Sequence, residues 1–490
     1  MKKLISFLTA IIFILGIVAC AQDGDADKDK NQNLPVEDQN VFEGVDLGGE
    51  LITIMCLTTT EGTAKINSYS DLKADELTGD PIVDAVYERN ESIKSLLNCD
   101  LEVYEMGVYG SSGTINVGSD LKNNLLSGNP DNIYAGFVNG ISLSPLLSGE
   151  LLYNLNDIST TGLDNQWWYN DANDSMTING KLFAATGDFS VRGLVSMSAV
   201  FFNKTLIDRY ETLEDPYTLV REGRWTIDKL TEYANLMTEL GGDDKLDIED
   251  QVGFVSEWGS SFYYLSAAGI RAYENDGNGV YFALNTNEAQ TMITKISNLL
   301  TNKLVSKTVA DHYQDNYSAS GVLSYFGDNK IAFYSHNIYD ALELRDMQAE
   351  FGMLPLPKLT ETQKEYHSIS NRYFSSYAIV PLASPDAEIS GTIINAMAYY
   401  GNKLLREAVY DRSFRSLKLL RDEESVEMFE LIIETQIQDM GLFFTSNAYS
   451  MVSGIGKGNP ASYSSTLTKN LAKMQSDIDL LMSIYADKEG

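Results

Sequence analysis

Short apolar runs alternate with amphipathic stretches along most of this chain, and this alternation is the feature that most constrains its fold. Strand-like apolar runs lie at 51–57, 132–138, 199–202, 252–255, 331–334 and 377–380. Residues between them carry apolar side chains at helical spacing. Strands that alternate with helices usually build parallel sheets covered by helices. The sequence therefore predicts an α/β fold with largely parallel sheets.

Several predicted helices have clear starting signals. Asp80-Pro81 opens a helix that runs to about Leu97, because aspartate caps a first turn and proline suits its start. Ser384-Pro385 opens another, which should close at Gly401. Apolar residues at helical spacing follow Thr226 and Asn287, and two further helices are expected near 423–440 and 464–486.

The N-terminus has the pattern of an export signal. Lys2 and Lys3 precede the apolar run 4–19, which is short for a membrane span, and the run ends in Ile17-Val18-Ala19-Cys20. This ending resembles the lipobox of bacterial lipoproteins, which implies lipid attachment to Cys20 after cleavage before it. We expect a signal peptide over 1–19, a lipidated flexible tether over 20–46, and a protein anchored on the extracellular face of the membrane. An ordinary signal or an uncleaved anchor helix is the alternative.

Length and charge restrict what lies beyond the tether. The remaining residues are too many for one hydrophobic core, so two or more lobes are expected. The formal net charge of the whole chain is −33. A surface this acidic repels phosphate backbones, so no nucleic acid partner is predicted.

Common catalytic and metal-binding patterns are absent from the sequence. There are three histidines and no HExxH, CxxC or GxSxG spacing. The acidic stretch 243–250 fails the EF-hand register at Lys245 and is interpreted as a turn. Cys56 and Cys99 lie near opposite ends of what would be neighbouring parallel strands, so both should be free thiols. We predict no metal, no cofactor and no enzymatic activity.

Tryptophan and tyrosine offer flat apolar faces with a polar edge, which suits stacking on sugar rings. Trp258 directly follows the strand-like run 252–255, and ligand crevices lie at the carboxyl ends of such strands. Trp167 and Trp168 are as compatible with packing inside a lobe as with ligand contact.

Six blocks of the sequence carry a family resemblance, in this order along the chain: 179–184, 199–207, 224–228, 326–333, 351–357 and 377–385. Together they resemble extracellular solute-binding proteins of the maltose-binding type, the substrate-binding lipoproteins of ABC importers. Where that family has a tryptophan-containing segment, this chain has Ser335-His336-Asn337-Ile338-Tyr339, and this chain is also longer.

The resemblance implies a two-lobed periplasmic-binding-protein-like (type II) fold that closes about a hinge, with an ABC importer permease as partner. By analogy lobe 1 would comprise 47–190 with 353–402, and lobe 2 would comprise 195–350 with 405–490. Ligand contacts carried over by position are Trp258, Tyr339, Asn337, Asn139, Asp188 and Arg192, with Trp167 and Trp168 added.

Three functions stay open at this point. The first is a receptor for a carbohydrate, with the sugar stacked on Trp258 and Tyr339. The second keeps the receptor but binds an amino acid, a peptide or another charged solute, for which Arg192 is the candidate clamp. The third is an exported glycan-active enzyme with two suitably spaced carboxylates.

Overall fold

The computed structural model describes residues 41–58, 72–107, 117–128, 132–242, 245–247, 249–257, 259–275, 279–308, 319–344, 347, 349–372, 375–410 and 422–486. The expected signal peptide, Cys20 and Trp258 lie outside these ranges. The chain divides into two units, Met1–Val45 and Asp46–Gly490, and both large sheets belong to the second. No helix in the described ranges is long and apolar enough to cross a membrane.

The first sheet has four strands in the order β11-β3-β1-β2. Strands β1 (Glu50–Thr58), β2 (Cys99–Gly107) and β3 (Ile133–Val138) are parallel, and β11 (Tyr377–Ile379) runs antiparallel to β3. Cys99 lies opposite Glu50 and Cys56 opposite Glu105, so the expected pairing of these neighbouring parallel strands is confirmed. Both thiols are buried and free.

The second sheet has five strands in the order β10-β4-β9-β5-β8. Its parallel strands are β5 (Val252–Ser256), β8 (Ser306–Thr308) and β9 (Ile331–Asn337), while β4 (Ser198–Asn203) is antiparallel to β9 and to β10 (Phe351–Pro355). Both sheets are therefore mixed, with a parallel core. Because β10 pairs along β4, residues 353–355 belong to this sheet and not to lobe 1, where the sequence analysis placed them.

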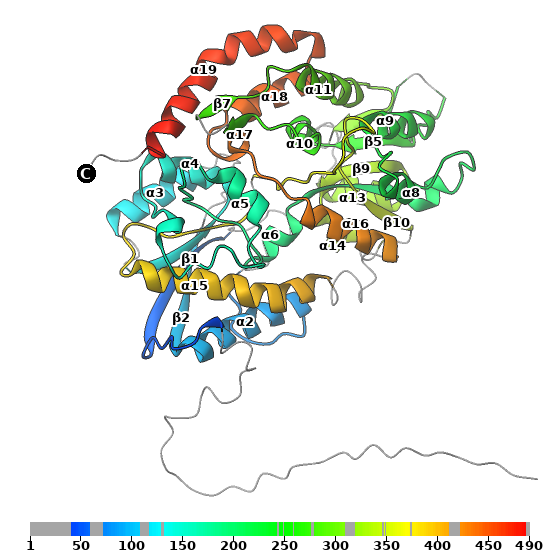
Figure 1. Cartoon of the computed structure of the whole chain (residues 1–490). Helices are drawn as coiled ribbons and strands as arrows, with labels where there is room; N and C mark the ends of the chain where they lie inside the picture. The colour runs from blue at the N-terminus through cyan, green and yellow to red at the C-terminus, as the bar shows by residue number, and fades with distance from the viewer. Residues whose placement is uncertain are drawn as a thin grey trace, which may run out of the picture. The chain divides into compact units, whose positions relative to one another are not determined.

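Helices cover the faces of both sheets (Figure 1). Those beside the first sheet include α2 (Pro81–Leu97), α3 (Val117–Ser127), α4 (Gly140–Ser148), α5 (Asn170–Met176) and α15 (Ala387–Tyr400), the last continuing as the π-helical turn η4 (Gly401–Leu405). Those beside the second sheet and the following segments are α7 (Lys204–Ile207), α8 (Pro216–Arg221), α9 (Ile227–Leu236), α10 (Ser260–Ala267), α11 (Asn287–Leu300), α13 (Ala319–Gly327), α14 (Asp340–Glu343), α16 (Glu423–Glu434), α17 (Met440–Phe443), α18 (Asn447–Lys457) and α19 (Tyr463–Ile484). The short elements are η2 (Leu155–Asp157), α6 (Val191–Val195), β6 (Tyr273–Asn275), β7 (Val280–Phe282) and η6 (Pro460–Ser462).

Helix starts match the sequence signals in most places. The Asp80 carboxylate accepts the Ile82 and Val83 amides at the start of α2, and Pro81 occupies the first helical position. The predicted start at Ser384-Pro385 is wrong by two residues. Asp386 caps α15 instead, because its carboxylate accepts the backbone amides of Glu388 and Ile389.

One predicted helix is interrupted. The region 423–440 was expected to be a single helix, but α16 ends at Glu434 and α17 begins only at Met440. Between them Gln436 forms a β-bridge with Ser368, and a second bridge joins Ser370 to Met197. These bridges place side by side three stretches of chain that lie near the junction of the two sheets.

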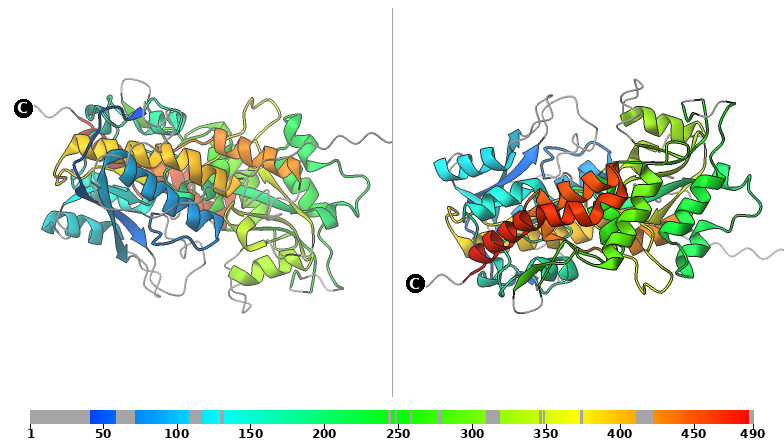
Figure 2. Two further views of the ribbon diagram at one scale, coloured as in Figure 1. Left: turned by 90° about the horizontal axis from the view of Figure 1, so that it is seen from below. Right: turned by 90° about the horizontal axis from the view of Figure 1, so that it is seen from above.

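The C-terminal helix α19 touches elements on both sides. It contacts α18 and β7, and it also contacts α4 beside the first sheet; Figure 2 shows it lying lengthwise across its neighbours. Just after its end, the Tyr485 ring packs edge-on against Phe183 at 5.0 Å between centroids. Tyr485, in the region that the sequence analysis assigned to lobe 2, therefore packs on Phe183, in the region that it assigned to lobe 1.

Candidate functional site

Three polar residues lie at the carboxyl ends of parallel strands, and two of them, Asn139 and Asn337, were predicted from the sequence. Asn139 follows β3, Asn337 ends β9, and Glu257 follows β5. Asn139 and Asn337 are 2% and 3% exposed, so both amides are buried at the edges of their sheets. In open α/β sheets, ligands bind at this edge.

A histidine between two carboxylates lies at this edge of the second sheet. His336 Nε2 is 2.8 Å from Glu257 Oε1, and His336 Nδ1 is 2.5 Å from Asp340 Oδ2. The Tyr334 hydroxyl donates to the same Asp340 oxygen at 2.7 Å, and the Tyr334 ring stacks on the imidazole at 5.5 Å. Strand β9 supplies Tyr334 and His336 to one face because they are two residues apart.

The charges in this group support one another. Burial alone would lower the pKa of His336, but Asp340 and Glu257 outweigh burial and hold that pKa well above its ordinary value. Burial likewise opposes ionisation of Glu257, yet the charge and hydrogen bond of His336 lower the pKa of its carboxyl below the usual range. We therefore assign an imidazolium with two carboxylates at neutral pH.

Aromatic side chains gather beside this group. The Tyr449 ring lies 6.4 Å from the Tyr263 ring, and the Arg372 guanidinium lies 5.1 Å from the Tyr449 centroid. A Cβ at Gly259 would stand 2.1 Å from the Tyr449 hydroxyl, so only glycine permits this approach next to Trp258. The arrangement joins α10, α18 and the segment before β11.

The same aromatic region reaches Asn139. A Cβ on the following residue, Gly140, would lie 2.3 Å from the Phe443 ring and 3.0 Å from the Arg372 carbonyl oxygen. The Gly140 amide donates to Ser375 Oγ at 3.1 Å. The carboxyl end of β3 therefore contacts α17 and the segment that leads to β11.

The sequence analysis missed Glu257, His336, Asp340, Tyr263, Arg372 and Tyr449 as site residues. Glu257, His336 and Asp340 adjoin predicted positions, but helical spacing did not signal their pairing, because His336 lies on strand β9 and Asp340 begins α14. Tyr449 and Arg372 had none, because only the tertiary fold brings α18 and the segment before β11 to this edge.

Four residues that were predicted as ligand contacts lie in packed or hydrogen-bonded positions. Trp167 donates to Asn395 Oδ1 at 2.8 Å and packs edge-on against Tyr399, while Trp168 donates to the Thr161 carbonyl at 3.2 Å. Tyr339 is 4% exposed within a hydrophobic cluster of the second sheet. Asp188 is fully buried and bonded to the side chains of Tyr169, Asn402 and Arg406.

The structure thus places Trp167, Trp168, Tyr339 and Asp188 in buried positions with protein contacts, and their role as ligand contacts stays a prediction. Arg192 lies in α6, 8% exposed, where the chain passes from one sheet to the other. The described residues therefore bring Asn139 and Asn337 to the strand ends, while Trp258 lies outside the described ranges.

Comparison with solved structures identifies the architecture. A maltose-binding periplasmic protein from Listeria monocytogenes, solved with maltose, matches with a TM-score of 0.54 at 14% identity, covering 90% of this chain and 99% of that chain. An ABC substrate-binding protein from the same organism, solved with cycloalternan, gives 0.53 at 14%, covering 89% and 99%. A receptor from Streptomyces glaucescens, solved with acarbose, gives 0.54 at 14%, covering 88% and 99%.

The chain has the maltose-binding-type solute-binding-protein fold. The expected two-lobed type II architecture is thereby confirmed. No protein-family profile matches the sequence, and no curated protein matches it.

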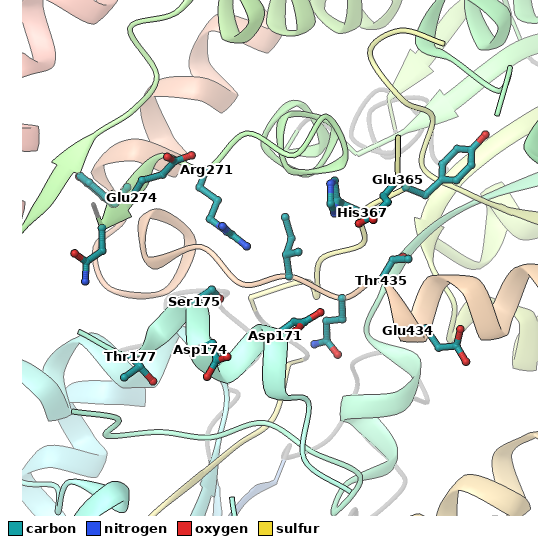
Figure 3. A pocket seen from close by; sticks show the side chains of 15 residues that line it. Asp171, Asp174, Ser175, Thr177, Arg271, Glu274, Glu365, His367, Glu434 and Thr435 are labelled. Atoms are coloured by element: carbon teal, nitrogen blue, oxygen red, sulfur yellow. The ribbon is translucent and has the colours of Figure 1, made fainter. Parts of the chain in front are cut away.

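Two of the cavities in the described part of the chain bear on the position of the site. A cavity of about 10 Å³ beside the histidine group is lined by Glu257, Tyr263, His336, Asn337 and neighbouring hydroxyl residues, and it has room for about one water molecule. A cavity of about 540 Å³ lies elsewhere, between α5, β6 and the two bridged segments 365–367 and 434–437. Figure 3 shows Asp171 and Asp174 on one side of it and Arg271 and Glu274 on the other.

The larger cavity is separate from the predicted ligand contacts, because none of those residues lines it. Its walls carry five carboxylates, one arginine and His367, whose pKa burial lowers. In the described ranges, no group of three or more His, Cys, Asp or Glu side chains is arranged to hold a metal ion. We therefore place the candidate solute site at the strand ends and not in this cavity.

Proposed function

We propose that this chain is a lipid-anchored extracellular receptor that captures a carbohydrate and delivers it to an ABC importer. The observation that carries the proposal is the juxtaposition, at the strand ends of a solute-binding-protein fold, of a partly exposed Glu257 carboxylate with the half-buried Tyr449 ring, which packs against the buried Tyr263. Carboxylates accept hydrogen bonds from sugar hydroxyls, and aromatic faces pack on the apolar faces of sugar rings. Charged residues with aromatic neighbours suit a polyhydroxylated ligand of this kind.

The proposed contacts come from both sheets. Glu257, Asn337 and Trp258 would act from the second sheet, and Asn139 from the first. Tyr449 and Arg372 would approach from the segments between them. Polar contacts from separate elements fix a sugar only when those elements lie close together, so this assignment supports closure about a hinge at the bridged segments.

The thermal stability of the full-length chain tests the ligand class. The protein is purified in a detergent without a sugar headgroup, and its melting temperature is measured with mono- and oligosaccharides, amino acids and short peptides. A ligand at a hundred times its dissociation constant adds about 2.7 kcal/mol to the free energy of unfolding, which raises the melting temperature by a few degrees.

Each outcome of this screen has a definite meaning. A shift with saccharides alone supports the carbohydrate receptor. Shifts with amino acids or peptides alone keep the receptor and replace its ligand. If no solute raises the melting temperature and a chromogenic glycoside is hydrolysed, the chain is an enzyme and the proposal is wrong.

The anchor is tested separately through Cys20. In bacterial cells expressing the full chain, radiolabelled palmitate should enter the wild-type protein, and Cys20→Ser should abolish that label. The variant should also move from the membrane fraction to the soluble or secreted fraction, since a lipid chain supplies its membrane affinity. Label retained by the Cys20→Ser chain would contradict lipidation at this residue.

A further inference from the structure

Only one oxygen of the Glu257 carboxylate is bonded within the described part of the protein. Its Oε1 pairs with His336, and within the described part of the chain Oε2 has no hydrogen-bond donor. The Glu257 side chain is 35% exposed, whereas His336 and Asp340 behind it are 17% and 10% exposed. One carboxylate oxygen is therefore anchored and the other is open.

The histidine pairs favourably with both of its carboxylate neighbours only when it carries a proton on both nitrogens. A neutral imidazole has one N–H donor, so one of the two carboxylates would face a lone pair. The doubly protonated ring donates a hydrogen bond from Nε2 to Glu257 and forms an ion pair with Asp340 at Nδ1. The rise in the pKa of His336 agrees with this geometry.

Groups behind the histidine hold its orientation. Asp340 begins α14 and accepts from the Tyr334 hydroxyl, and the Tyr334 ring lies nearly parallel to the imidazole at 16°. The remaining residues around the small cavity are Ser198, Ser260, Tyr263, Tyr264, Ser335, Asn337 and Leu356, none of which is charged at neutral pH. Glu257 and Asp340 are thus the acids that set the charge of His336.

We propose that His336 is a positioning residue that fixes the Glu257 carboxylate as a hydrogen-bond acceptor for a hydroxyl of a neutral sugar. Its imidazolium removes the rotational freedom of Glu257 before the ligand arrives, which lowers the entropic cost of binding. The open Glu257 oxygen is an acceptor that carries negative charge, so it repels the carboxylate of an acidic sugar, such as a uronic acid, placed against it. This inference rests on the carbohydrate receptor proposed above.

The first test needs no ligand. The chain has three histidines, so the imidazole signals of the full-length protein can be assigned by NMR with single His→Gln variants. The His336 signal should keep its imidazolium shift well above pH 6.5, and His336→Gln should raise the titration midpoint of the Glu257 carboxyl. A His336 that titrates near 6.5, or a Glu257 midpoint unchanged in the variant, would overturn the proposal.

The second test measures sugar affinity by calorimetry, with maltose, maltotriose and glucuronic acid as probes. His336→Gln should weaken binding of the neutral sugars about ten- to a hundredfold, the range expected for losing a hydrogen bond to a charged group. In the wild type, affinity should fall as pH rises through the raised pKa of His336. The variant should lose that pH dependence, while His367→Gln, a histidine outside the site, should keep wild-type binding and profile.

Failure of this inference and failure of the proposed function look different. Wild-type affinity and pH profile in His336→Gln would refute positioning while leaving the receptor intact. Tighter binding of glucuronic acid than of the neutral sugars would refute the proposed charge selection. Absence of saccharide binding in the wild type would refute the receptor, and the ligand-free NMR titrations would still decide the role of His336.

Discussion

The hydroxyl of Tyr169 donates a hydrogen bond of 2.6 Å to Oδ1 of the fully buried Asp188. The other oxygen accepts from Asn402 at 2.7 Å and pairs with Arg406 at 3.3 Å. Both oxygens are thus used within the protein, and burial with the nearby Asp188 charge holds the pKa of Tyr169 well above its ordinary value. The sequence resemblance suggested a ligand contact here, but this carboxylate joins α5 to the η4 region.

Replacing Asp188 should therefore reduce stability more than binding. Asp188→Ala strands a buried tyrosine hydroxyl and a half-buried guanidinium, and we expect the free energy of unfolding to fall by about 3 kcal/mol. Tyr169→Phe is the matched control and should cost about 1 kcal/mol. Urea unfolding measures both, and unchanged stability with lost sugar binding in Asp188→Ala would restore Asp188 as a ligand contact.

Two glycines on helix α18 should respond to alanine in opposite directions. A Cβ on Gly456 would lie 2.0 Å from Ser261 Oγ, whereas a Cβ on Gly454 meets nothing within 4 Å. Gly456→Ala should destabilise by about 1–3 kcal/mol through overpacking. Gly454→Ala should stabilise by about 0.5–1 kcal/mol, because alanine loses less backbone entropy in a helix. Equal effects in thermal unfolding would show that α18 does not pack on α10 as described.

Asp439 should make stability depend on pH in an unusual direction for a carboxyl group. It is 1% exposed, accepts the Ala272 and Gly441 amides, and burial raises its pKa from 3.8 to about 6. A raised folded-state pKa contributes stability that is complete below the unfolded value and is lost as pH rises through about 6.

The test compares unfolding of the wild type with Asp439→Asn across the same pH range. From pH 4 to 7 the wild type should lose about 3 kcal/mol relative to the variant, which cannot titrate at this position. Comparison with the variant cancels the contribution of the many other acids. A constant difference between the two proteins would mean that Asp439 titrates near its unfolded value.

Replacing Trp258 distinguishes a binding role of this residue from a packing role. Trp258→Ala should remove saccharide binding in calorimetry while the melting temperature stays nearly unchanged, because the proposed contact is with the ligand. Trp225→Ala is the contrasting variant, since Trp225 is fully buried and donates to the Pro355 carbonyl at 3.0 Å. It should cost about 3–5 kcal/mol of stability. A comparable loss from Trp258→Ala with binding retained would make Trp258 a core residue.

Local patterns in the sequence were enough for the architecture. The six strand-like runs correspond to β1, β3, β4, β5, β9 and β11, because strands covered on both faces, whether parallel or antiparallel, need nearly continuous apolar stretches. The prediction of one helix over 423–440 is wrong because the helix ends before Gln436. The side chain of Gln436 donates to Ser370 Oγ, and its backbone forms a bridge with Ser368. Helical periodicity cannot reveal such a contact, since the partner lies far away along the chain.

The candidate site was less predictable for the same reason. Strand ends at Asn139 and Asn337 can be located from apolar runs alone. The contacts of Tyr449 with Tyr263 and Arg372 depend on three segments meeting in space, and no local pattern encodes them. The buried setting of Asp188 could not be predicted, because its partner residues Asn402 and Arg406 come from a distant part of the chain.

The bridges Met197–Ser370 and Ser368–Gln436 join three separate segments of the chain side by side. A single connecting segment would let the two sheets rotate, twist and slide relative to each other. Segments that are bridged to one another along their edges resist twisting and sliding, so they bend most easily across the bridges. We therefore expect the two halves of this fold to move relative to each other mainly about one axis, across the bridged segments.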